Sequence, residues 1–217
     1  KMKNNRFITT VIPTFNREEY LKKAIESCIN QTINHEIIVC NHGGTDGTDE
    51  MIKQYEGKLR YIKKEKDNGP NYCWLDGVME AQGEFINLLF DDDWIDSDYL
   101  EKCMKFFDDP EVGFVFTPAK IYDDEKQKVI DVQHNNYLFQ DGIYKVSKYE
   151  LDLLYSLISP TAFIMRKSDM IASLYNGLLP FAKYQYRGVG PDRLMILLCM
   201  LRYPSFAFVN EPHVYFR

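Results

Sequence analysis

The sequence predicts an α/β fold in which a mainly parallel sheet is flanked by helices, with a smaller mixed β region in the second half. In the first half of the 217 residues, short apolar runs alternate with amphipathic segments. This alternation is typical of strand–helix–strand units, whose right-handed crossovers join parallel strands. Composition indicates a packed domain, because hydrophobic residues make up 45% of the chain and charged residues 27%.

Four strands are expected in the first half, and three of them end at a polar turn. Their ranges are 7–12, 36–40, 59–64 and 84–90. The run 84–90 is nearly all apolar, as in a strand that is covered on both faces. Ligands of such sheets bind beyond the carboxyl ends of the strands, so the turns 13–17, 41–48 and 91–93 are expected to meet at one edge.

Capping residues mark where the helices between these strands begin. Asn16 and Glu19 have the spacing of a capping box. Thr48 is expected to cap a second helix, with Asp49 and Glu50 placed where the helix dipole favours acids. Two further helices are expected over 72–81 and 97–107.

The second half combines further strands with two marked helix starts. Strands are expected over 112–122 and 128–134, as a hairpin, and over 159–166, and a final extended segment is expected over 206–216. One helix is expected to start at a capping box of Ser147 and Glu150, and another at Pro191, since proline favours the first helical position. Because there are no repeats or linkers, 1–217 is interpreted as a single domain.

Net charge, cysteine spacing and the length of apolar runs argue against several classes of protein and site. The net charge of −6 disfavours a nucleic-acid-binding surface, and an acidic chain that binds an anion needs a metal ion or aimed backbone amides. The five cysteines form no C-x-x-C pair, which indicates reduced thiols in a cytoplasmic protein and argues against a zinc site. No apolar stretch reaches the roughly 18 residues of a membrane span.

Three consecutive carboxylates, Asp91–Asp93, follow the most apolar predicted strand. Alternation along an extended chain would place Asp91 and Asp93 on one face and Asp92 on the other. Adjacent carboxylates repel, and a cation between them keeps them ionised; oxygen ligands suit Mg²⁺ or Mn²⁺, which also hold diphosphates. A solvated acidic loop is the alternative, but the position after a core strand favours the metal-and-diphosphate site.

A glycine-rich turn, 41–48, follows the second predicted strand. Its three glycines could bring backbone close to a ligand, and the next helix presents free N–H groups. A simple strand-to-helix turn explains the same residues equally well, and His42 fits either a pocket or an exposed turn.

Taken in order, these segments resemble the family 2 glycosyltransferases of the GT-A fold. The resemblance is continuous from about residue 7 to residue 100 and rests on four blocks. They are VIPTFNR at 11–17, EIIV at 36–39 with GGTDGT at 43–48, DNG at 67–69, and DDDW at 91–94.

The resemblance implies a transferase that moves a sugar from a nucleotide diphosphate donor, with a UDP-sugar as first choice, and inverts the anomeric carbon. About 7–110 would bind the nucleotide sugar and about 111–217 the acceptor. The residues that it assigns to the nucleotide are Pro13, Thr14, Phe15, Asn41, His42, Asn68, Gly69, Asp91 and Asp92. Asp93, together with Asp91, would hold Mn²⁺ or Mg²⁺.

Inversion needs a general base that takes the proton of the acceptor hydroxyl as its oxygen attacks. In the family this base is an acid at the start of a late helix, and Asp192 matches that context directly after Pro191. The helix dipole also favours an acid in a first turn, and the two roles are compatible.

Departures from the family leave the donor open. Asn41 and His42 stand where the family usually has two acids, and Trp74, better explained as core, stands where it often has an arginine. A GDP- or dTDP-sugar donor and a binding module without catalysis therefore remain alternatives, whereas the lack of G-x-G-x-x-G disfavours a Rossmann dehydrogenase. The cations considered for the phosphates, besides the metal, are Arg187, Arg193 and Arg217.

The resemblance also implies the partners, namely a nucleotide-sugar donor and a glycan or lipid-linked saccharide acceptor, as in the extension of a bacterial surface glycan. Nucleic acid is not expected. The location is expected to be cytoplasmic, and peripheral association with the inner face of the membrane through the apolar run 194–201 is the minority alternative to a core helix. A homo-oligomer, and a natural chain that continues beyond Arg217, are left open.

Overall fold

An eight-stranded sheet forms the centre of the computed structural model, which describes residues 7–135, 138, 140–156, 158–176 and 191–217. Its order is β3-β2-β1-β4-β10-β6-β11-β9. The strands are β1 (Ile8–Thr14), β2 (Glu36–His42), β3 (Arg60–Lys64), β4 (Phe85–Leu88), β6 (Val112–Phe116), β9 (Gly142–Lys145), β10 (Phe163–Arg166) and β11 (Ser205–Phe208). The first four strands of the chain are parallel, and antiparallel β10 joins them to the strands of the second half. The predicted fold class is confirmed.

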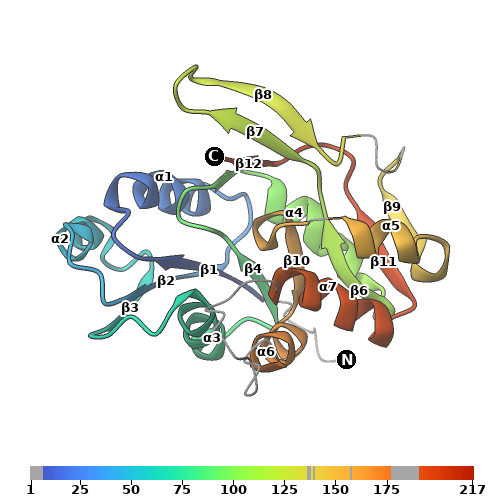
Figure 1. Ribbon diagram of the computed structural model, residues 1–217, viewed down its shortest axis with the longest axis horizontal. Coiled ribbons are helices and arrows are strands. Elements are labelled where there is room, and N and C mark those ends of the chain that lie inside the picture. Colours follow the sequence, from blue (N-terminus) through green and yellow to red (C-terminus); the bar gives the residue numbers. More distant parts are fainter. Residues whose placement is uncertain (1–6, 136–137, 139, 157, 177–190) are drawn as a thin grey trace.

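Helices cover both faces of this sheet (Figure 1). They are α1 (Glu18–Ile29), α2 (Thr48–Ile52), α3 (Pro70–Glu80), α4 (Tyr99–Met104), α5 (Glu150–Tyr155), α6 (Lys167–Asn176) and α7 (Pro191–Arg202). α1 lies on one face, and α3 and α6 lie on the other, where α3 packs against β1 and β2. Within the described ranges, none of these helices is long and apolar enough to span a membrane.

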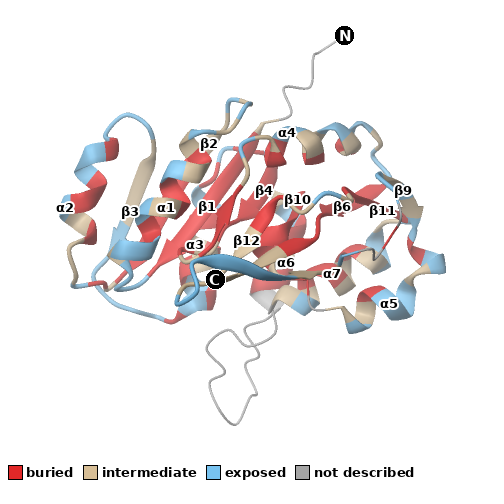
Figure 2. Ribbon diagram, turned by 90° about the horizontal axis from the view of Figure 1, so that it is seen from above, coloured by how far each residue is buried: buried red, intermediate tan, exposed pale blue. Residues whose placement is uncertain are grey.

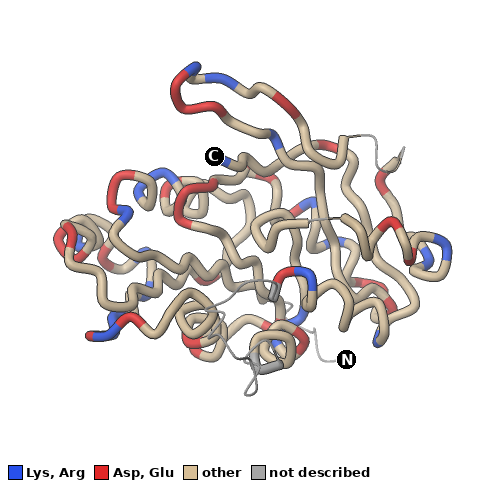
Figure 3. The backbone as a smooth tube through the Cα atoms, in the orientation of Figure 1, with Lys and Arg blue, Asp and Glu red and all other residues tan. Residues whose placement is uncertain are grey.

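Burial explains why the central strands are so apolar. Every residue of β1 is buried, as expected for a strand with helices on both faces. Figure 2 shows buried strands between helices whose outer faces are exposed, and Figure 3 shows lysine, arginine and acidic residues mixed over the outer segments. The core is therefore one layered cluster that leaves the strand ends free to carry polar side chains.

A smaller sheet of order β5-β12-β7-β8 begins directly after the acidic segment 91–93. Its strands are β5 (Trp94–Ile95), β7 (Ala119–Asp123), β8 (Lys128–Gln133) and β12 (Val214–Phe216). Because β12 pairs with β5, the last residues of the chain lie next to the acidic segment.

Two segments predicted as continuous are each divided between the two sheets, and one predicted strand is therefore wrong in extent. The range 112–122 is β6 in the large sheet and β7 in the small one. The break falls where the Thr117 N–H donates to the Ala162 carbonyl and Pro118 has no N–H to continue a ladder. The range 206–216 is likewise divided into β11 and β12.

The segment around β10 also differs from the prediction. Only the second half of 159–166 is strand, because Pro160–Ala162 form a 3₁₀ turn. α6 follows β10 and was not predicted. Ser147 lies in a short 3₁₀ turn and does not cap α5, which begins at Glu150.

The predicted caps of the first two helices are wrong, because the two strand-end turns cap each other. Asn16 has a left-handed backbone with φ 53°, and its Oδ1 accepts hydrogen bonds from the N–H groups of Thr45 (2.7 Å) and Asp46 (3.3 Å). Asp46 in turn accepts from the Glu18 N–H at the start of α1 (3.0 Å) and from the Thr48 N–H at the start of α2 (3.2 Å). This exchange fixes the first turn against the second.

Candidate active site

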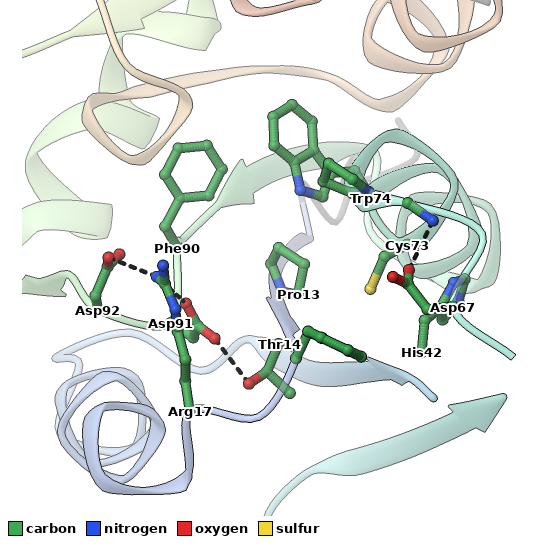
Figure 4. A pocket seen from close by; sticks show the side chains of 13 residues that line it. Pro13, Thr14, Arg17, His42, Asp67, Cys73, Trp74, Phe90, Asp91 and Asp92 are labelled. Atoms are coloured by element: carbon green, nitrogen blue, oxygen red, sulfur yellow. Dashed lines mark hydrogen bonds and ion pairs between the residues drawn. The ribbon is translucent and has the colours of Figure 1, made fainter. Parts of the chain in front are cut away.

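The carboxyl ends of β1, β2 and β4 and the start of α3 surround a pocket of about 380 Å³ (Figure 4). The residues that line it are Pro13, Thr14, Phe15, Arg17, His42, Asp67, Gly69, Pro70, Cys73, Trp74, Phe90, Asp91 and Asp92. All of them lie between positions 13 and 92, and they include parts of all three predicted turns. The expected convergence of strand-end turns on one edge is therefore present.

Arg17 holds two of the three consecutive carboxylates. Its Nη1 lies 3.3 Å from Asp91 Oδ1 and 2.7 Å from Asp92 Oδ2. The other oxygen of buried Asp91 accepts a 2.8 Å hydrogen bond from the Thr14 hydroxyl. Burial raises the pKa of Asp91 more than the contacts with Thr14 and Arg17 lower it. The Arg17 side chain is half-exposed, so a cation at the pocket wall already offsets the charge of these acids.

Asp93 is buried behind the pocket and does not line it. Its Oδ2 accepts a 2.8 Å hydrogen bond from the Thr161 hydroxyl, and its Oδ1 accepts one from the Arg217 backbone N–H at 3.2 Å. Burial is the main cause that raises its pKa to about 7, and the charges of Asp92 and Asp91 act in the same direction. Asp91 and Asp93 are both buried whereas Asp92 is partly exposed, which agrees with the predicted alternation. Their hydrogen-bond partners differ, because Asp91 accepts from Thr14 and Asp93 accepts from Thr161 and the Arg217 backbone.

The acidic segment offers the oxygen ligands that Mg²⁺ and Mn²⁺ prefer. In the described part of the chain, however, the group of three potential ligand atoms within 4.8 Å of one another is Cys40, His42 and Cys73, and it contains no aspartate. An ion held by Asp91 and Asp93 would take only one or two carboxylates from the protein and would need phosphate oxygens and water to complete its shell. Burial raises the pKa of both carboxyls, and a cation bound beside them would favour the ionised form.

The two residues at the end of β2 have different positions. His42 lines the pocket although its side chain is almost fully buried, and its Nε2 lies 3.2 Å from Asp76 Oδ2. Burial lowers the pKa of His42, but the contact with Cys40 and the charges of Cys40 and Asp76 outweigh it, so the pKa is raised. Asn41 is absent from the pocket lining, because its amide donates to the Tyr61 hydroxyl (2.8 Å) and accepts from the Gly44 N–H (3.1 Å).

The loop before α3 supplies one expected residue and one that was missed. Gly69 lines the pocket with φ 93°, a conformation that favours glycine, and the exposed Asn68 does not line it. Asp67, which was not predicted, lines the pocket and accepts a 2.7 Å hydrogen bond from the Gly69 N–H. A Cβ at Gly43 would lie 2.6 Å from the Asp67 backbone nitrogen, so the two loops are in direct contact.

Aromatic side chains form the apolar part of the pocket. The rings of Trp74 and Phe90 have centroids 5.2 Å apart, and both residues line the cavity. Trp74 is half-buried and packs against the hydrophobic core, as expected, and it also faces the pocket. Phe15 is 47% exposed and lines the same pocket.

Asp192 lies apart from the pocket lining. It is half-buried in the first turn of α7, which packs against α6. Of the cations considered for the phosphates, Arg193 is exposed on α7, and Arg217 pairs with Asp124 at 3.3 Å. Arg187 lies outside the described residues. Among the described residues, Arg17 in the first predicted turn is the cation that pairs with Asp91 and Asp92, and its position in that turn was the signal that could have identified it.

Comparison with known proteins identifies a family-model match to "Glycosyl transferase family 2" over residues 9–172. The glycosyltransferase GlyA of Streptococcus pneumoniae is 35% identical over 102 residues, which cover 45% of this chain and 14% of GlyA. The chondroitin synthase of Pasteurella multocida is 32% identical over 114 residues, covering 51% of this chain and 12% of that protein. The chain therefore spans only a small part of these relatives.

Solved structures share the fold at low sequence identity. S. aureus TarS in complex with UDP superposes with a TM-score of 0.76 at 20% identity, covering 97% of this chain and 60% of that one. The mannosyltransferase PcManGT from Pyrobaculum calidifontis, in complex with GDP-Man and Mn²⁺, gives a TM-score of 0.62 at 15% identity, covering 94% and 54%.

The pKa of Asp93 predicts how the stability of the metal-free protein depends on pH. The pKa is raised from its ordinary 3.8 to about 7, so between these values the folded state binds a proton that the unfolded state releases. The contribution of this group to stability is therefore largest at acid pH and falls as pH rises through that window, by a few kcal/mol in order of magnitude.

Asp93→Asn should remove most of this pH dependence, which denaturant unfolding in a chelator at pH 5 and pH 8 would measure. Asp92→Asn, on the same segment but partly exposed, is the matched control and should retain most of it. An unchanged slope in Asp93→Asn would contradict the assignment.

Proposed function

The chain belongs to glycosyl transferase family 2, and we propose that it transfers a sugar from a nucleotide diphosphate donor to a hydroxyl group of a glycan or lipid-linked acceptor. The observation that carries the proposal is the strand-end pocket, which combines an aromatic wall with an acidic segment that is paired with Arg17. A ligand that is flat and apolar at one end and anionic at the other matches both parts. A nucleoside diphosphate has this character.

The base and ribose are assigned to the part of the pocket formed by Pro13, Thr14, Phe15, His42 and Gly69. Aromatic and proline side chains give a base apolar contact, and an imidazole can hydrogen-bond to its edge. UDP is the proposed nucleotide, supported by the UDP and UDP-GlcNAc complexes of TarS. Asn41 and Asn68 stay weaker predictions, because neither lines the pocket.

The diphosphate is assigned to the acidic segment and Arg17. Asp92 and Arg17 line the pocket, where the guanidinium can turn from the carboxylates to phosphate oxygens and form charge-assisted hydrogen bonds. Asp93 and Asp91 would hold Mn²⁺ or Mg²⁺, which supplies Lewis-acid stabilisation of the charge that gathers on the leaving diphosphate. Thr14 and Thr161 orient these two carboxylates by donating to them.

Asp192 is proposed as the general base of an inverting transfer. The acceptor oxygen forms a bond to the anomeric carbon while its proton passes to the Asp192 carboxylate. The bond between that carbon and the diphosphate oxygen breaks, and its electron pair leaves with the diphosphate. Attack from the side opposite the leaving group inverts the carbon, so no covalent enzyme intermediate is formed.

The proposed donor predicts selective stabilisation by nucleotides. UDP at about 100 times its Kd should raise the free energy of unfolding by about 2.7 kcal/mol, and the affinity should increase with Mn²⁺. A thermal-shift screen of UDP, GDP and dTDP with and without Mn²⁺ tests both points. Stabilisation by GDP or dTDP alone would mean that the donor is a GDP-sugar or a dTDP-sugar. No stabilisation by any of the three nucleotides would overturn the proposal.

Arg17→Gln should weaken the binding of UDP and leave the binding of uridine unchanged, because only UDP carries the diphosphate. A hydrogen bond between charged groups contributes about 1.5–3 kcal/mol, so the Kd for UDP should rise roughly tenfold or more. Isothermal titration calorimetry would measure both ligands. Lys22→Gln, an equal loss of charge on the exposed side of α1, is the control and should bind UDP as the wild type does.

Asp192→Asn should retain donor binding and lower kcat by about 10²–10⁴-fold, since the acceptor proton would have no base to receive it. Donor affinity and initial rates of sugar transfer measure the two effects. Glu150→Gln is the matched control, because Glu150 is also an acid in the first turn of a helix. Near wild-type rates in Asp192→Asn would assign the base to another residue.

A further inference from the structure

At the floor of the pocket, two thiols and an imidazole come together. Cys40 and His42 lie on β2 and Cys73 lies on α3, and all three are buried. Their potential ligand atoms lie within 4.8 Å of one another. His42 and Cys73 also line the pocket, so the cluster is reached from the cavity.

The strand and the helix bring these residues together for a simple reason. Side chains two positions apart on a strand point to the same face, so Cys40 and His42 both face α3. Gly77, one turn beyond Cys73, allows the helix to approach closely, because a Cβ there would lie 2.5 Å from Val11 Cγ1 and 3.5 Å from Cys40 Cβ. The cluster therefore depends on helix-to-strand packing and has no C-x-x-C spacing in the sequence.

The imidazole at the centre of this cluster is buried between two ionisable neighbours, Cys40 and Asp76. His42 is 1% exposed, and among the described residues neither of its ring nitrogens has a hydrogen-bond partner of good geometry. Asp76 Oδ2, one helical turn after Cys73, lies 3.2 Å from Nε2 as an ion-pair neighbour. A buried polar ring without hydrogen bonds is costly, and a ligand at this point would remove the cost.

We propose that Cys40, His42 and Cys73 form a binding site for a thiophilic divalent cation, with Zn²⁺ as the fitting ion. Two sulfur ligands and one imidazole match Zn²⁺, whereas Mg²⁺ and Mn²⁺ prefer the oxygen ligands of the acidic segment. On binding, each cysteine thiol gives its proton to solvent and the imidazole binds through a neutral nitrogen. Three protein ligands leave the fourth position of a tetrahedral ion open.

The open coordination position of the proposed Zn²⁺ ion faces the part of the pocket that is assigned to the nucleotide. Because His42 and Cys73 line the pocket, a bound ion and its water would occupy the floor on which the base is proposed to rest. Zn²⁺ would then compete with the nucleotide, and this part of the inference rests on the proposed function. The binding of UDP without Zn²⁺ tests that function separately.

X-ray absorption of the Zn²⁺-loaded wild-type protein tests the site without any substitution. The expected first shell contains two sulfur atoms at about 2.3 Å together with nitrogen or oxygen, and a shell without sulfur would overturn the proposal. Titration of the chelator-treated protein with Co²⁺ should give one thiolate-to-metal charge-transfer band per chain. Cys73→Ser should lose most of it, whereas Cys103→Ser, an equally buried cysteine elsewhere, should keep it.

The proposed competition between Zn²⁺ and UDP is tested by a separate measurement of the Kd for UDP. One equivalent of Zn²⁺ should raise the Kd of the wild type for UDP at least tenfold, and the same Zn²⁺ should have little effect on Cys73→Ser. An equal effect on both proteins would show that Zn²⁺ acts on the nucleotide or on the acidic segment, and would overturn the competition.

Discussion

The burial of negative charge at the end of β4 is the constraint on which the rest of the site depends. Asp91 and Asp93 are removed from water on either side of a partly exposed Asp92. Removing carboxylates from water is unfavourable unless donors or cations compensate. The compensating groups come from both halves of the chain, because Thr14 belongs to β1 and Thr161 precedes β10. The acidic segment therefore joins the two halves of the fold as well as marking the candidate site.

The pocket in front of these acids is preorganised by contacts between loops. Asn16 and Asp46 exchange hydrogen bonds with each other's turns, and Gly43 brings the second turn into contact with the loop before α3. All of these contacts join protein loops to one another. The walls of the pocket are thus set by the protein alone, which reduces the ordering cost when a ligand binds.

Short-range sequence patterns predicted those features of the fold that depend on residues close together in the chain. The apolar run before Asp91 and the rule for strand ends were enough to place three turns at one edge. Features that depend on distant partners could not be predicted. Asn16 looks like a helix cap until its partner at Thr45 is known, and strand alternation continues through Pro118 although the chain changes sheets there. The thiol–imidazole cluster was missed because Cys73 meets Cys40 only through the packing of α3 on β2.

The buried position of Asp93 has one further consequence. An acid with a pKa of about 7 is partly protonated at neutral pH, so the charge of the site is not a fixed quantity. Such a group can release its proton when positive charge arrives and take it back when that charge leaves. Binding of a cation beside Asp93 would therefore be coupled to the release of a proton.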